Sequence, residues 1–181
     1  MEYLDVYLHD RKVGTLSSDK GKMEFSYSAE YIQLPDAEPL AFTLPLSETP
    51  YSSGSVVSFF SNLLPDESVR VRIAEILGVS PENIFGLLKE IGEDCAGAVA
   101  LFSPERKPTS ITEPIFTPLS EDEAHNVLSN LVDRPLNVGA EDFHISGAGA
   151  QDKLVASVQK GIIYLPLKGT PSTHIIKPGI S

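Results

Sequence analysis

The sequence contains a single cysteine and no long apolar run, and both features narrow what the protein can be. Cys95 alone cannot form an intrachain disulfide, and no cluster of Cys and His has the ligand spacing of a zinc site. The longest apolar runs, at residues 96–102 and 162–167, are far shorter than the roughly 20 residues of a membrane-spanning helix. We therefore expect Cys95 to be a small buried side chain, in a protein without a zinc site or a membrane span.

Basic residues are also scarce. The chain has 14 Lys and Arg against 25 Asp and Glu, which gives a formal net charge of −11. This charge argues against nonspecific binding to nucleic acid, which draws most of its energy from cationic side chains. Any association with DNA is therefore expected to occur through a partner. Acidic Glu2 and Asp5 stand where a signal peptide has its basic region, so we expect the protein in the cytoplasm.

The 181 residues suffice for one compact domain or two small ones. Alternating apolar residues predict a hairpin with strands at 4–8 and 13–16, and a third strand at 23–27. Four prolines between residues 34 and 51 favour an extended segment that covers the sheet.

Two helices are expected next. Asp66 can cap a helix that ends at Gly78, and Ser80 can cap a second helix that ends at Gly92. Their inward-facing residues are expected to be Val69, Ile73, Ile76 and Leu77 in the first helix, and Ile84, Leu87, Leu88 and Ile91 in the second.

The second half of the chain follows a proline-rich stretch. Residues 96–102 read as a buried strand, and residues 104–118 read as a linker or long loop. Ser120 and Glu123 form a capping box for a helix, and strands are expected at 154–158, 162–167 and 174–177. The pattern predicts an α+β protein with a small β-rich N-terminal module with helices at 1–103 and a second unit at 119–181.

The segment ISGAGAQDK at residues 145–153 is the most informative motif. Its small residues would let backbone N–H groups approach a phosphate. The segment lacks the Gly-Lys-Ser/Thr of a Walker A loop and leads into a strand, so a plain tight loop remains an alternative. Lys177, at the end of a later apolar strand, completes the order of parts in a protein-kinase N-lobe, where a lysine meets the nucleotide phosphates. The alternative for Lys177 is an exposed lysine at a strand end.

Four segments resemble the HipA family of serine/threonine kinases, which are toxins of toxin–antitoxin pairs. These segments are FFSNLLPD at 59–66, IGEDCAGAV at 91–99, SGAGAQDK at 146–153 and STHIIKP at 172–178, and they occur in the family's order. The resemblance covers almost the whole chain. Residues 59–66 have no obvious catalytic role, and we expect them to anchor a helix end in the core.

The resemblance implies a role for several residues. The residues that would bind ATP are Ala148, Gly149, Ala150, Gln151, Asp152, Lys153 and Lys177. Ser146 matches the family's autophosphorylation site, and a phosphate there would repel ATP from the loop. By composition alone, the favoured reading of Ser146 is a turn residue whose hydroxyl bonds the local backbone. His125 and His144 have no visible partner and are expected on the surface.

Phosphoryl transfer also needs a catalytic aspartate and ligands for Mg²⁺. Neither pattern follows Lys177, so we expect this polypeptide alone not to turn over ATP, with the Mg²⁺ ligands outside it. Three explanations are open: a fragment of a longer kinase, which we favour, a natural truncated homologue, or a second chain that supplies the rest.

The resemblance implies that the complete kinase phosphorylates a translation component such as glutamyl-tRNA synthetase and pairs with a HipB-like DNA-binding antitoxin. The main alternative is a noncatalytic module that binds an antitoxin or a separate kinase chain. A third reading, an unrelated phosphate-binding protein, would leave the match at residues 59–66 to chance.

Overall fold

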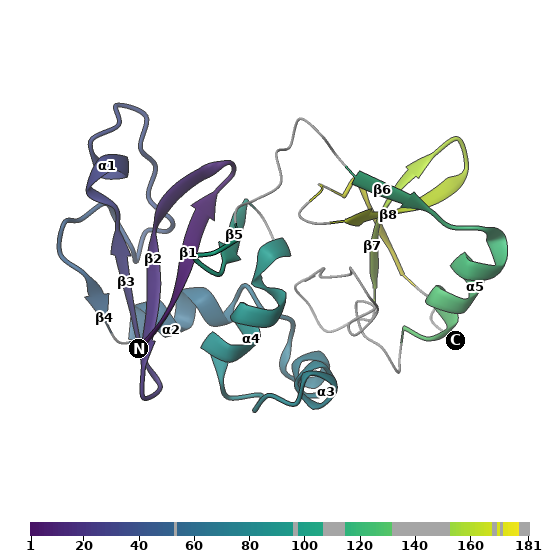
Figure 1. Ribbon diagram of the computed structural model, residues 1–181, viewed down its shortest axis with the longest axis horizontal. Helices are drawn as coiled ribbons and strands as arrows, with labels where there is room; N and C mark the ends of the chain where they lie inside the picture. The colour runs from purple at the N-terminus through teal and green to yellow at the C-terminus, as the bar shows by residue number, and fades with distance from the viewer. Residues whose placement is uncertain are drawn as a thin grey trace.

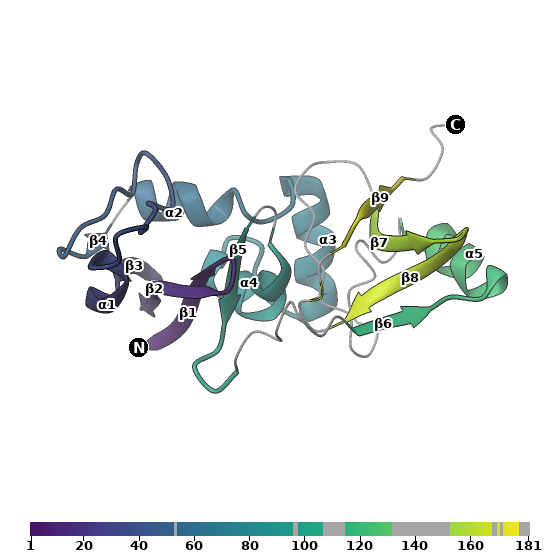
Figure 2. The same cartoon turned by 90° about the horizontal axis from the view of Figure 1, so that it is seen from above.

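The computed structural model describes residues 1–52, 54–95, 98–106, 115–131, 153–167, 170 and 172–177. In these residues two antiparallel sheets lie in separate halves of the molecule (Figures 1 and 2). The strands of the first sheet are β1 (Glu2–Leu8), β2 (Arg11–Asp19), β3 (Lys22–Tyr27), β4 (Tyr51–Ser52) and β5 (Val99–Phe102). The strands of the second sheet are β6 (Ile115–Pro118), β7 (Leu154–Gln159), β8 (Ile162–Leu167) and β9 (His174–Ile176). The helices are α1 (Ala29–Ile32), α2 (Gly54–Ser61), α3 (Glu67–Leu77), α4 (Ile84–Ile91), the short 3₁₀ helix η1 (Gly92–Asp94) and α5 (Glu121–Ser129).

The first sheet has the strand order β4-β3-β2-β1-β5. The three strands expected from the first 27 residues are present, and each is longer than or as long as its apolar pattern indicated. Lys20 and Gly21 both have positive φ in the turn between β2 and β3, the conformation that a two-residue hairpin loop requires. Gly14 permits the close approach of β2 and β3, because a Cβ there would lie 2.2 Å from the backbone oxygen of Ser26.

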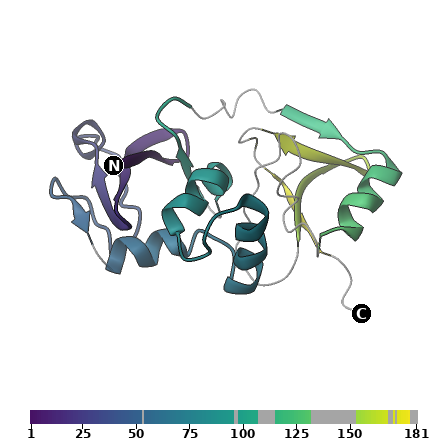
Figure 3. The same ribbon diagram turned by 60° about the horizontal axis from the view of Figure 1, so that its bottom comes forward.

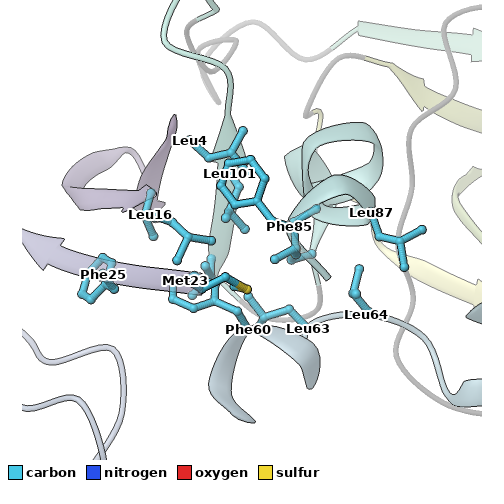
Figure 4. Close-up of a cluster of buried hydrophobic side chains, with 14 of the residues drawn as sticks. Leu4, Leu16, Met23, Phe25, Phe60, Leu63, Leu64, Phe85, Leu87 and Leu101 are labelled. Atoms are coloured by element: carbon cyan, nitrogen blue, oxygen red, sulfur yellow. The ribbon is translucent and has the colours of Figure 1, made fainter. Parts of the chain in front are cut away.

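A single apolar cluster joins the first sheet to its helices. Sheet residues such as Leu16 and Phe25 meet Phe60 of α2, and the Phe25 and Phe60 rings lie 5.7 Å apart. Phe85 and Leu87 of α4 complete this layer (Figure 4). Leu87, Leu88 and Ile91 are buried as the amphipathic pattern of α4 predicted, whereas Ile84 is only partly buried and the buried Phe85 was not predicted.

The helix boundaries differ in part from the expected ones. Gly78 ends α3 in the left-handed conformation, as expected, with φ of 66°. Asp66 stands at the N-cap of α3, but its side chain makes no capping hydrogen bond, and Ile76 is 41% exposed, not inward-facing. The N-cap of α4 is Asn83, not Ser80, because the Asn83 side chain accepts a hydrogen bond from the Gly86 amide at 2.9 Å.

The proline-rich segment after α1 is held against the first sheet by two tyrosines. The Tyr27 hydroxyl donates to the Leu44 carbonyl at 2.6 Å and accepts from the Leu40 amide at 2.8 Å. The Tyr31 hydroxyl bonds the carbonyl and the amide of Glu38 in the same way. These tyrosine hydrogen bonds explain how the extended segment is attached to the sheet that it covers.

The second sheet has the order β6-β8-β7-β9. Residues 115–118, placed at the end of the expected linker, instead form β6, which pairs with β8. Pro118 is tolerated there because β6 is an edge strand. The capping box of α5 is present as expected, and the hydrogen bond from Ser120 lowers the pKa of Glu123.

A second, smaller apolar cluster lies between α5 and the second sheet. It contains Leu131, Leu154, Ala156 and Leu165. In Figures 1 and 3, α5 lies on the side of the second sheet that faces away from α3 and α4. Among the described residues, no helix is both long and apolar enough to cross a membrane, and no group of His, Cys, Asp and Glu could hold a metal ion.

Candidate nucleotide-binding site

Only two of the residues expected to bind ATP lie within the described part of the chain. These are Lys153, just before β7, and Lys177, just after β9. Ser146, Ala148, Gly149, Ala150, Gln151 and Asp152 lie outside the described residues. The geometry of the site is therefore the geometry of β7, β9 and the two lysines.

Strands β7 and β9 are antiparallel neighbours in the second sheet. Leu154 pairs with Ile176, Val155 with Ile175 and Ala156 with His174. Lys153 and Lys177 are the next residues beyond the Leu154–Ile176 pair, so they stand opposite each other at one end of this ladder. Directly opposed residues in antiparallel strands have Cα atoms about 4.5–5.5 Å apart, so both lysines can reach one polyanion.

Side chains on a strand alternate between the two faces of the sheet, which assigns the lysines to a face. Leu154 and Ile176 belong to the apolar cluster beneath α5. Lys153 and Lys177 therefore extend from the opposite face, together with Val155 and Ile175. The sequence prediction of strands at 154–158 and 174–177 was sufficient to anticipate this alternation, although not the pairing.

The two lysines differ in their exposure. Lys153 is 6% exposed, whereas Lys177 is exposed. A buried side chain has few accessible conformations, whereas an exposed lysine can adjust to a bound group. The end of the β7–β9 ladder thus places one buried and one exposed lysine side by side.

A polar chain that the sequence analysis did not single out joins the other end of the same ladder. The Ser157 and Thr173 hydroxyls lie 3.2 Å apart, and Thr173 Oγ1 lies 2.7 Å from His174 Nδ1. The Thr173 amide also donates to the Ala156 carbonyl at 3.1 Å. These contacts hold the start of β9 on β7, and hydroxyl residues at matching strand positions were the only signal for them in the sequence.

The segment FFSNLLPD has the structural role expected of it. Phe60, Leu63 and Leu64 are buried in the first apolar cluster, and Phe59 packs against it. A cavity of about 240 Å³ adjoins this segment. It is lined by Ser61, Asn62, Leu64, Pro65, Asp66, Glu67 and Arg70. Carboxylates and a guanidinium share this lining, so its charge does not select a ligand of one sign.

The remaining candidate residues have structural surroundings. Cys95 is buried and its thiol donates to the Gly92 carbonyl at 3.4 Å, as expected of a small core side chain. His125 Nε2 lies 3.5 Å from the Ser129 hydroxyl on the exposed face of α5. This contact is local to one helix, and His144 lies outside the described residues.

Comparison with known proteins assigns the family. The model of the HipA N-terminal domain matches residues 4–102, which comprise the first sheet and its helices. The chain is an α+β protein with the two antiparallel sheets described above. It belongs to the HipA family and contains the family's N-terminal domain.

Relatives match beyond that domain. A Sinorhizobium fredii protein named "Putative kinase Y4mE" is 37% identical over 182 residues, covering 98% of this chain and 43% of its own length. The "Serine/threonine-protein kinase toxin HipA" of Shewanella oneidensis is 33% identical over 96% of this chain and 39% of its own. A Shewanella oneidensis MR-1 structure, described as the toxin–antitoxin system HipA, HipB and its operator DNA complex, matches with a TM-score of 0.71. It is 29% identical and covers 95% of this chain and 39% of that one.

The chain thus spans about two-fifths of the length of these relatives. A shorter relative also exists. An uncharacterized Haemophilus influenzae protein is 26% identical over 96 residues, which make up 87% of that protein. A segment about as long as the 4–102 domain therefore occurs as nearly an entire protein in a relative.

Proposed function

We propose that this chain is the N-terminal portion of a HipA-type serine/threonine kinase and that its second unit holds the phosphates of ATP. The observation that carries the proposal is the position of Lys153 and Lys177 at one end of the β7–β9 ladder. The glycine-rich segment 146–152 leads directly into this end of β7. Backbone amides from such a segment and two lysine side chains supply the donors and the charge that a triphosphate needs.

The proposal assigns no residue of this chain as a Mg²⁺ ligand or as the catalytic aspartate. In this proposal they come from the part of the longer kinase that the relatives contain and this chain does not match. Bound Mg²⁺-ATP supplies the phosphoryl group. The residues of this chain bind and orient the phosphates.

Phosphorylation of Ser146 is the proposed regulatory step. A phosphate there adds about −1.5 to −2 charges beside a segment that holds the phosphates of ATP. Repulsion between the two anionic groups then disfavours nucleotide binding. Phosphorylated protein is accordingly inactive, and the reaction limits itself.

The proposed partner is a HipB-like DNA-binding antitoxin. The Shewanella oneidensis structure contains HipA, HipB and operator DNA, which supports a partner of this kind. A net charge of −11 disfavours direct contact of this chain with DNA, so the antitoxin provides the DNA contact. The proposed protein substrate is a translation component such as glutamyl-tRNA synthetase, and the proposed location is the cytoplasm.

Autophosphorylation tests the kinase proposal. The native protein, purified at its natural length, is incubated with Mg²⁺ and ATP, and its peptides are analysed by mass spectrometry. We expect one phosphate on Ser146 that is absent in Ser146→Ala and retained in the control Ser129→Ala, since Ser129 ends the exposed helix α5. Phosphate elsewhere, or none at all in protein that binds ATP, would contradict the assignment.

The second candidate is a noncatalytic module that binds an antitoxin or a separate kinase chain. The Haemophilus influenzae relative favours it, because the 96 matched residues make up 87% of that protein. An intact native mass near 19.6 kDa together with no ATP binding would support this candidate. A larger mass and ATP binding would support the kinase.

A further inference from the structure

The two units of the chain meet at a valine on β7. Leu154 and Ala156 are buried in the cluster beneath α5, and Val155 extends from the other face of the sheet. Val155 packs against the apolar cluster of the first unit, which is otherwise built from residues 4–101. Among the described residues of the second unit, it is the one apolar side chain assigned to that cluster.

The elements of the first unit that lie nearest this contact are its helices. Figures 1 to 3 agree in placing α3 and α4 between the first sheet and the second. In Figure 4, Leu64 and Leu87 stand at the edge of the labelled cluster on the side where the second sheet is drawn.

Among the described residues of the second unit, the contact with the first apolar cluster lies on β7. Val155 is half-buried, whereas its cross-strand partner Ile175 is 64% exposed. The first unit therefore supports the strand that follows the glycine-rich segment and leaves the Lys177 strand open. A restraint on β7 acts on the strand that begins after the buried Lys153, while Lys177 beyond β9 stays exposed.

Val155 is also close to the proposed phosphate site. A strand rises about 3.3 Å per residue, so Val155 lies about 7 Å along β7 from Lys153, on the same face. Lys153 is nearly buried, so its position depends on how the start of β7 is held. A shift of the strand at Val155 would therefore move Lys153.

From these observations we propose that the N-terminal domain positions the nucleotide site through Val155, which acts as a positioning residue and makes no contact with ATP. This inference rests on the proposed function. It assigns the N-terminal domain a role in ATP affinity, in addition to any role in binding an antitoxin.

The test uses the native protein with three substitutions. Val155→Ala removes most of the contact, Val155→Ile keeps a branched apolar side chain, and Val158→Ala is the matched control. Val158 is a half-buried valine on the same strand and belongs to neither apolar cluster. Affinity is measured with a fluorescent ATP analogue, and folding is checked by thermal unfolding.

We expect Val155→Ala to weaken binding of the analogue by about three- to tenfold, within the range by which residues that do not touch a ligand modulate its affinity. Val155→Ile should bind within about twofold of wild type, and Val158→Ala should be unchanged. If general destabilisation of the protein weakened binding, Val155→Ala and Val158→Ala would lose affinity to the same extent, which would contradict a specific role of Val155. Equal affinity in folded Val155→Ala and wild type would overturn the inference.

Hydrogen exchange of the β7 amides separates this inference from the proposed function. If the first unit holds β7, exchange at residues 154–157 is faster in Val155→Ala than in Val158→Ala, whether or not the protein binds ATP. Failure of the wild type to bind the ATP analogue would refute the proposed function. Unchanged exchange in Val155→Ala would refute the anchoring of β7 itself.

Discussion

At the scale of single residues, Tyr27 shows how a polar atom stabilises this fold. Its ring lies in the first apolar cluster, and its hydroxyl bonds Leu40 and Leu44 of the proline-rich segment. We predict that Tyr27→Phe lowers the free energy of unfolding by about 1–3 kcal/mol, because it leaves an amide and a carbonyl without their partner. Urea unfolding measures this change. Tyr3→Phe is the control, because Tyr3 is half exposed and should lose little.

The same residue gives the fold a pH dependence at the alkaline end. Burial, partly offset by the hydrogen bond from the Leu40 amide, raises the pKa of Tyr27 from 10.0 to about 12. Since the folded-state pKa lies above the unfolded value, the stabilising contribution of the neutral phenol is complete below pH 10. It is lost as the pH rises from 10 towards 12. The free energy of unfolding of Tyr27→Phe should therefore fall less steeply than that of the wild type between pH 10 and 12. Identical pH profiles of the two proteins would contradict the assignment.

At the scale of secondary-structure elements, the start of α4 shows which of two possible N-cap residues caps the helix, a choice that the sequence alone could not make. Asn83 caps the helix, whereas the Ser80 hydroxyl bonds the Glu82 carboxylate. We predict that Asn83→Ala destabilises the protein by about 1 kcal/mol, the usual cost of a lost N-cap. Ser80→Ala should change stability very little. Chemical denaturation of both variants measures the difference, and a larger loss in Ser80→Ala would mean that the helix begins earlier.

The sequence predicted elements best where the signal was local. Apolar alternation located the first three strands, and Gly78 marked the end of α3. The capping box of α5 was equally clear. The sequence predicted elements less well where contacts between distant residues determine the boundaries of an element. Ser80 and Asn83 are both good capping residues, and the choice between them depends on which turns of α4 pack on the core.

The strand β6 illustrates the same limit. Prolines at 114 and 118 read as a linker, yet residues 115–118 pair with β8, some 50 residues further along the chain. Pairing over such a distance leaves no local trace in composition. Propensity was overridden here by the tertiary contact.

At the scale of the whole molecule, the candidate site depends on two segments that meet across the sheet. The sequence indicated both lysines, through the glycine-rich segment and the later strand. It could not place Lys153 opposite Lys177, because that position follows from the register of β7 on β9, with β8 lying between them in the chain. Nor could it show that Val155 reaches the core of the N-terminal domain.

Binding of Mg²⁺-ATP to the native protein and to a Lys177 variant tests the central claim most directly. Lys177→Gln is compared with Lys160→Gln, an exposed lysine in the β7–β8 turn, by isothermal titration calorimetry. Each substitution removes one positive charge, so the comparison isolates position from net charge. If the lysines hold the nucleotide phosphates, Lys177→Gln binds at least about tenfold more weakly than wild type, while Lys160→Gln binds as wild type does. Equal affinity in all three proteins, or no ATP binding by the wild type, would contradict the assignment of this chain as the phosphate-binding part of a kinase.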